Sequence, residues 1–107
     1  ENKFVKKTRV DEKLDDKGFF NFIFNDLANK GINNLLIETG SIINTLLLSL
    51  NLVDEIVIFR SGNIIGNDGL AFVNSLDFND IKELSNYKIS YLRSFQDDIL
   101  EIRNFVK

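Results

Sequence analysis

Residues 31–69, GINNLLIETGSIINTLLLSLNLVDEIVIFRSGNIIGNDG, carry the pattern that decides the fold. The stretch predicts an apolar strand over 34–38, buried on both faces, then a glycine turn and a helix over about 41–51. A second strand over 55–60 and a glycine-rich loop follow. Short connections between the two strands and the helix favour a right-handed parallel crossover. In such a unit, ligands collect at the turn where the first strand ends and the helix begins.

The flanking sequence adds a helix and a hairpin. An apolar stripe at 3.6-residue spacing predicts a helix over 17–30, with an aspartate before it as a cap and Gly31 as its C-terminal glycine. Alternating side chains predict an antiparallel hairpin over 87–106 with its turn near 96–98. We therefore expect an α/β domain over 1–107 whose mixed sheet combines a parallel strand–helix–strand core with this hairpin.

Composition restricts the chemistry. The chain of 107 residues contains no cysteine and no histidine, which excludes disulfides, Cys/His zinc sites and histidine-based triads within it. Any acid–base group is therefore a carboxylate, a lysine, a tyrosine or a group of the ligand. The net charge of −3 argues against nucleic acid as a partner. No apolar run is long enough to span a bilayer and no signal peptide opens the sequence, so we expect a cytoplasmic protein. Because methionine is absent, we expect the sequence to be a piece of a longer chain.

The turn between the first strand and the helix is the strongest candidate site. Glu38 ends the strand and can accept hydrogen bonds from a polar ligand. Gly40 lets a ligand approach the backbone, and the unpaired amides of the helix start attract a phosphate. Ser41 and Thr45 can add hydroxyl contacts. A second interpretation stays open, in which Gly40 only makes a tight turn and Ser41 only caps a core helix.

Four motifs of this region occur in the same order in a known family. They are Gly31-Ile32-Asn33, the run LLIETG over 35–40, Leu52-Val53-Asp54-Glu55 and Ile64-Ile65-Gly66. Together they resemble the C-terminal part of the reductase domain of the bifunctional riboflavin-biosynthesis deaminase–reductases, which has a dihydrofolate-reductase-like fold. The hairpin over 87–106 falls where the closing strands of that family lie.

The resemblance implies an NADPH-dependent reduction of 5-amino-6-(5-phosphoribosylamino)uracil, a phosphoribosylamino-pyrimidine. It implies that Glu38 contacts this substrate. It also implies that the glycine turn and the first helical turns bind the nicotinamide cofactor. The matching positions are Gly40, Ser41, Ile42, Ile43, Asn44, Thr45 and Leu46. The cofactor carries the hydride chemistry, so the protein mainly positions and orients the cofactor and the substrate.

Three departures from the family pattern matter. Thr39 stands where the family has a small residue, and the loop 60–63 lacks the family's proline. A reductase domain of this family is also about twice as long, so we expect little or no activity from these residues alone. Two other functions stay open: a related reductase with another substrate, and a non-catalytic α/β binding or dimerisation module. Similar reductases are usually dimers, which suggests a homodimer here.

Overall fold

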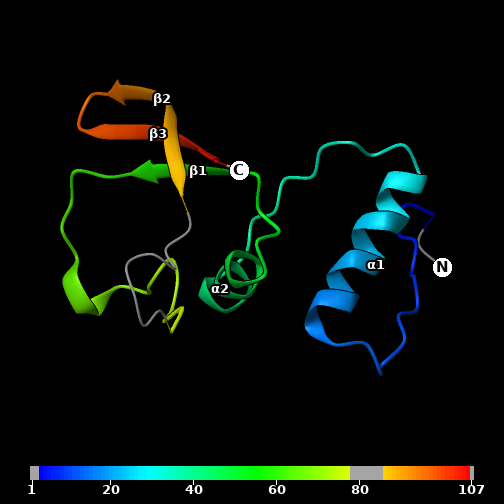
Figure 1. The fold of residues 1–107 in the computed structure, drawn as a ribbon. Helices are drawn as coiled ribbons and strands as arrows, with labels where there is room; N and C mark the ends of the chain where they lie inside the picture. Colours follow the sequence, from blue (N-terminus) through cyan, green and yellow to red (C-terminus); the bar gives the residue numbers. More distant parts are fainter. Residues whose placement is uncertain (1–2, 78–85, 107) are drawn as a thin grey trace. The chain divides into compact units, whose positions relative to one another are not determined.

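A computed structural model describes residues 3–77 and 86–106 (Figure 1). The chain divides into two compact units, Glu1–Glu38 and Thr39–Lys107. The first unit contains helix α1 (Asp16–Asn29). The second contains α2 (Ser41–Ser49), β1 (Glu55–Arg60), the short 3-10 helix η1 (Gly66–Asp68), β2 (Tyr87–Phe95) and β3 (Asp98–Phe105). In the described ranges, no helix combines the length and apolar character needed to cross a membrane.

Helix α1 begins and ends as the sequence predicts. The Asp15 carboxylate accepts a hydrogen bond from the amide of Gly18 at 2.7 Å, which caps the N-terminus. At the other end, Gly31 adopts φ +82° and its amide donates to the carbonyl of Ala28, while the Ile32 amide donates farther back. This pair of bonds is a Schellman motif, for which glycine is the favoured residue. The predicted helix over 17–30 is confirmed.

The predicted strand over 34–38 is not formed. These residues belong to no sheet, and Leu35, Leu36 and Ile37 are exposed. An apolar run becomes a strand buried on both faces only when a neighbouring strand takes its backbone hydrogen bonds and two layers cover its side chains. The described residues supply neither for this run. The expected parallel crossover is therefore wrong for this structure, and Glu38 does not stand at a strand end.

The second unit is built on a three-stranded antiparallel sheet in the order β1-β3-β2 (Figure 1). The hairpin of β2 and β3 confirms the prediction over 87–106, and its turn is tight, with Phe95 opposite Asp98 and Gln96 at φ +55°. The central strand β3 also pairs with β1, whose bounds match the predicted 55–60. All described strand pairs are antiparallel. The pair of β1 and β3 brings together segments that lie far apart in the sequence.

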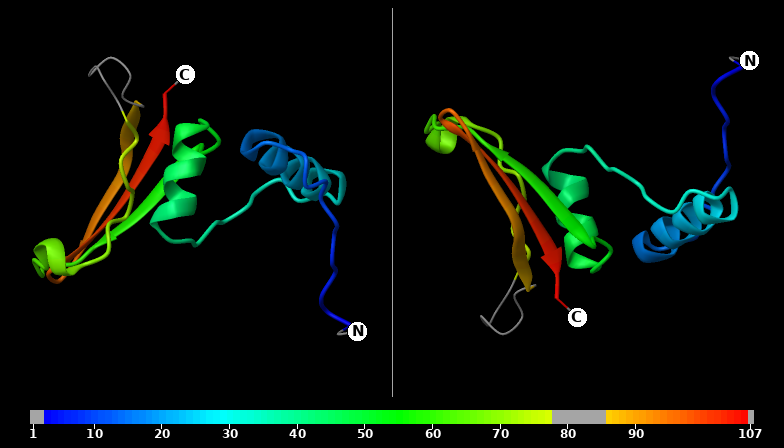
Figure 2. Two further views of the ribbon diagram at one scale, coloured as in Figure 1. Left: turned by 90° about the horizontal axis from the view of Figure 1, so that it is seen from below. Right: turned by 90° about the horizontal axis from the view of Figure 1, so that it is seen from above.

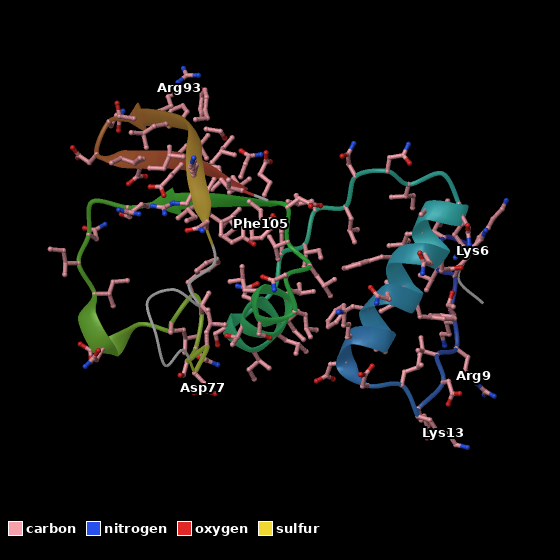
Figure 3. All side chains as sticks on the ribbon, viewed as in Figure 1. Lys6, Arg9, Lys13, Asp77, Arg93 and Phe105 are labelled. Atoms are coloured by element: carbon pink, nitrogen blue, oxygen red, sulfur yellow. The ribbon has the colours of Figure 1, made fainter. Side chains whose placement is uncertain are left out.

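Helix α2 lies along one face of this sheet in both views of Figure 2. Phe105 extends from the end of β3 toward α2 (Figure 3), and its ring lies 5.4 Å from that of Tyr87. The Tyr87 hydroxyl donates to the carbonyl of Val53, just after the helix, at 2.9 Å. Leu47 is the most buried apolar side chain among the described residues, with 3% of its surface exposed. The core of this unit is therefore the small layer between α2 and the sheet.

The opposite face of the sheet carries apolar side chains that no described residue buries. In an antiparallel sheet, residues directly opposite each other share a face, so Val57, Phe59 and Tyr91 lie on the side away from Phe105. All three are exposed. On the same face, the Arg93 guanidinium stacks over the Phe95 ring at 4.6 Å from its centre.

Candidate functional site

The N-terminus of α2 is the site that the sequence singles out. Gly40 is its N-cap residue, with φ −94° and ψ −179°, and its carbonyl accepts the first helical hydrogen bond from the Asn44 amide at 3.0 Å. No side chain caps this end. Helix α1 differs, because a carboxylate occupies the equivalent position there.

The missing cap leaves the first amides of α2 available. The N–H groups of residues 40–43 precede the first helical bond and have no partner within the helix. They carry the positive end of the helix dipole, which attracts an anion. In α1 the protein supplies that anion itself, through Asp15. In α2 the same position is open to a ligand.

The backbone does not require a glycine at position 40. Its φ of −94° is accessible to any residue, unlike the +82° of Gly31. A Cβ built on Gly40 would meet no described atom within 4 Å. These two observations are compatible both with a turn that is only structural and with a ligand site at Gly40. Because glycine has no side chain, residue 40 itself does not cover the helix amides.

Two of the predicted cofactor residues already hold the local structure. The Asn44 side chain accepts from the Thr39 hydroxyl at 2.7 Å and donates to the carbonyl of Phe72 at 3.1 Å. The Thr45 hydroxyl donates to the Ser41 carbonyl at 2.6 Å and accepts from the amide of residue 74 at 2.8 Å. These bonds attach the segment 72–74 to α2. Thr45 therefore keeps one oxygen lone pair, and no proton, for a ligand.

The remaining predicted residues separate into exposed and shielded positions. Ile42 is 73% exposed on the first turn of α2, whereas Ile43 and Leu46 are half-buried with the face that carries Leu47. Glu38 is exposed and is the last residue of the first unit. The described residues contain no cluster of three or more histidine, cysteine or acidic side chains that could hold a metal ion.

A hollow of the second unit lies elsewhere. It has a volume of about 500 Å³ and opens between the loop at Ser61–Asn63 and the β2–β3 turn. Gly62 approaches that turn so closely that a Cβ there would lie 3.0 Å from the Asp97 carbonyl oxygen. Asp97 and Asp98 line the hollow, so it disfavours a phosphate group. We do not assign it to the cofactor.

The sequence pattern did not predict an ion cluster that lies on the sheet. Glu101 is 4% exposed and accepts hydrogen bonds from Arg60, at 3.3 Å, and from Arg103. Glu101 and Arg103 are two residues apart on a strand, which places both on one face. The sequence shows the spacing of Glu101 and Arg103. It does not reveal the register of β1 against β3, which brings Arg60 to Glu101.

Comparisons with known proteins agree with these motifs. Residues 20–100 match the sequence model of the family described as the RibD C-terminal domain. A curated relative, the riboflavin biosynthesis protein RibD of Buchnera aphidicola subsp. Baizongia pistaciae, is 26% identical over 73 residues. That match covers 68% of this chain and 20% of the relative, so the chain spans about a fifth of the relative's length.

Solved structures show the same fold. Two forms of Acinetobacter baumannii RibD each superpose with a TM-score of 0.71 at 20% sequence identity. The alignments cover 79% and 80% of this chain and 24% of each RibD chain. The α/β fold class and the likeness to the fold of RibD are thereby confirmed, although the strand over 34–38 is not formed. With the family model covering most of its residues, the chain belongs to the family of RibD C-terminal domains.

Proposed function

We propose that this chain binds NADPH at the N-terminus of α2 and takes part in reducing 5-amino-6-(5-phosphoribosylamino)uracil in riboflavin biosynthesis. Membership of the RibD C-terminal family supports a reductase role. The observation that carries the cofactor assignment is the open helix start, where Gly40 leaves the amides uncapped and accessible. A phosphate of the cofactor is the anion that fits these amides.

The residues of α2 have separate roles in this proposal. The amides of 40–43 hold phosphate oxygens, and the Ser41 side chain adds a hydroxyl at the same turn. Ile42 offers an exposed apolar surface on which a ring of the cofactor can rest. Asn44 and Thr45 keep the turn in shape through their bonds to the segment 72–74. Bound NADPH supplies a hydride, so the protein's contribution is binding and orientation.

Glu38 completes the proposal as the substrate contact. Its exposed carboxylate can accept hydrogen bonds from the hydroxyl or amino groups of a ribosylamino-pyrimidine. Hydride transfer to the sugar carbon requires a proton on the neighbouring nitrogen or oxygen. Because these residues contain no histidine, the groups that they can offer for it are carboxyl, lysine and tyrosine side chains and bound water. A carboxylate next to the α2 turn in the sequence is suited to orient the sugar.

Replacing Gly40 with aspartate tests the cofactor site. An aspartate at the N-cap stabilises a helix, as Asp15 does in α1, but its carboxylate would compete with a phosphate for the same amides. We expect Gly40→Asp to keep or raise the thermal stability while weakening NADPH binding about tenfold or more, which is ~1.4 kcal/mol. NADPH fluorescence gives a direct titration, because the reduced nicotinamide ring absorbs at a longer wavelength than any side chain of the protein.

Gly40→Ala is the matched control, since it adds a Cβ in open space and no charge. It should bind NADPH within a few-fold of the natural chain. If Gly40→Asp binds NADPH as tightly as the natural chain, the helix start is not the phosphate site. If the natural chain does not bind NADPH at all, the cofactor assignment fails for these residues.

A further inference from the structure

The ion cluster on β1 and β3 carries a net positive charge and is anchored by a buried carboxylate. Arg60, Glu101 and Arg103 lie on the sheet face that also carries Phe105, because their positions share one register on the two strands. The Glu101 carboxylate is almost fully buried and receives a guanidinium on each oxygen. Two arginines and one glutamate leave a net charge of about +1. On this face, the described residues of the three strands include no other carboxylate.

Arg60 is the member of the cluster that can reach a ligand. Its side chain is 59% exposed, although one of its nitrogens is held 3.3 Å from the buried Glu101 oxygen. A guanidinium has five N–H donors in a planar fork, so most of them stay available. The buried glutamate restricts how the fork is oriented, which lowers the entropy lost when an anion binds. Such a fork matches the oxygens of a phosphate group.

The fold places Arg60 at the same end of the unit as the open helix start. Helix α2 and strand β1 run in opposite directions, as Figure 2 shows. The nine residues of α2 rise about 13–14 Å at ~1.5 Å each. A strand covers that height in about four residues at ~3.3 Å each, and β1 has six residues. The end of β1 and the start of α2 therefore lie toward the same end of the unit.

We propose that Arg60, held by Glu101, binds a phosphate monoester. Two ligands of the proposed reaction carry this group: the 2′-phosphate of NADPH and the sugar phosphate of the pyrimidine substrate. The choice between these two sources rests on the proposed function, whereas the recognition of a phosphate rests on the cluster itself. NADH and ribose lack the group and serve as the corresponding probes without it.

The test compares Arg60→Gln with Arg93→Gln in the 107-residue chain. Arg93 is a suitable control because it is also anchored, over the Phe95 ring, but lies on the opposite face of the same sheet (Figure 3). Both substitutions remove one positive charge. We expect Arg60→Gln to weaken binding of one phosphate-bearing probe about tenfold, and Arg93→Gln to leave it within twofold. Isothermal titration with NADPH, NADH, ribose 5-phosphate and ribose assigns the source of the phosphate.

Glu101→Gln separates positioning from charge. The substitution makes the cluster more positive, so attraction by charge alone would tighten phosphate binding. Loss of the anchored geometry weakens it instead, which is the result we expect. Circular dichroism identifies any variant that no longer folds, in which case the Arg60 and Arg93 pair alone decides.

Equal effects of Arg60→Gln and Arg93→Gln, or no effect of either, would overturn the inference. If ribose 5-phosphate binding depends on Arg60 while neither NADPH nor NADH binds, the phosphate site stands and the cofactor proposal fails.

Discussion

Leu47 is the side chain whose removal should reveal most about what holds the second unit together. It lies on α2, faces the sheet and is 3% exposed. Leu47→Ala removes three buried carbons, each contributing ~0.8 kcal/mol, so the transfer term is about 2.4 kcal/mol. The cavity left behind adds to this, which brings the expected loss to about 3 kcal/mol.

Ile42 provides a control on the same helix. Ile42→Ala also removes three carbons, but this side chain is 73% exposed. Only about a quarter of the transfer term applies, roughly 0.6 kcal/mol, and the better helix propensity of alanine offsets part of it. The two substitutions are therefore chemically similar and differ mainly in burial.

Urea unfolding followed by far-UV circular dichroism measures both effects. The expected difference between the variants is about 2.5 kcal/mol, which for a domain of this size corresponds to a shift in melting temperature on the order of 10–15 °C. If Leu47→Ala and Ile42→Ala lower the free energy of unfolding equally, the layer between α2 and the sheet does not stabilise the unit, and this account of its core is wrong.

Two further predictions concern Tyr87 and Glu38. Burial, and then the charge of Asp54, raises the pKa of Tyr87 above its usual 10, so the folded state holds this proton more tightly. Its contribution to stability is complete below about pH 10 and is lost as pH rises through the raised pKa. Tyr87→Phe should remove this alkaline dependence. It should also lower the free energy of unfolding by about 1 kcal/mol, because the hydrogen bond to the Val53 carbonyl is lost. Tyr91→Phe is the control and should have neither effect, and unfolding midpoints measured from about pH 8 to 11 test both variants. Glu38→Gln, in the natural gene product that carries these residues, should raise the KM for the pyrimidine substrate or lower kcat about tenfold, and unchanged steady-state kinetics would remove Glu38 from the site.

Local signals in the sequence predicted most of the elements. Gly31 ends α1 because its left-handed backbone suits glycine, and the alternation over 87–106 produced the hairpin. The end of α2 is similar, since Asn51 at φ +53° closes it with a second Schellman pair of bonds. Each of these features depends on residues close in sequence, so the pattern alone was sufficient.

The long-range features could not be predicted in the same way. The run over 34–38 has the composition of a buried strand, but a strand also needs a paired neighbour, and β1 pairs with β3. The contact between Arg60 and Glu101 joins residues 41 positions apart and follows from that register. For the candidate site, the sequence identified the Gly40 turn, whereas the free space around Gly40 and the bonds that hold Asn44 and Thr45 required the structure.

Among the described strands, β1 pairs only with β3, and this has a consequence for amide hydrogen exchange. The Phe105 amide donates to the Asp54 carbonyl, and in an antiparallel ladder the bonded pairs alternate from there. The amides of Ile56 and Ile58 therefore point to β3 and exchange slowly, while those of Val57 and Phe59 point to the outer edge and exchange rapidly. A strand that adds to this edge would protect the second pair and leave the first unchanged. The exchange rates of four neighbouring amides thus report whether the sheet ends at β1 in solution.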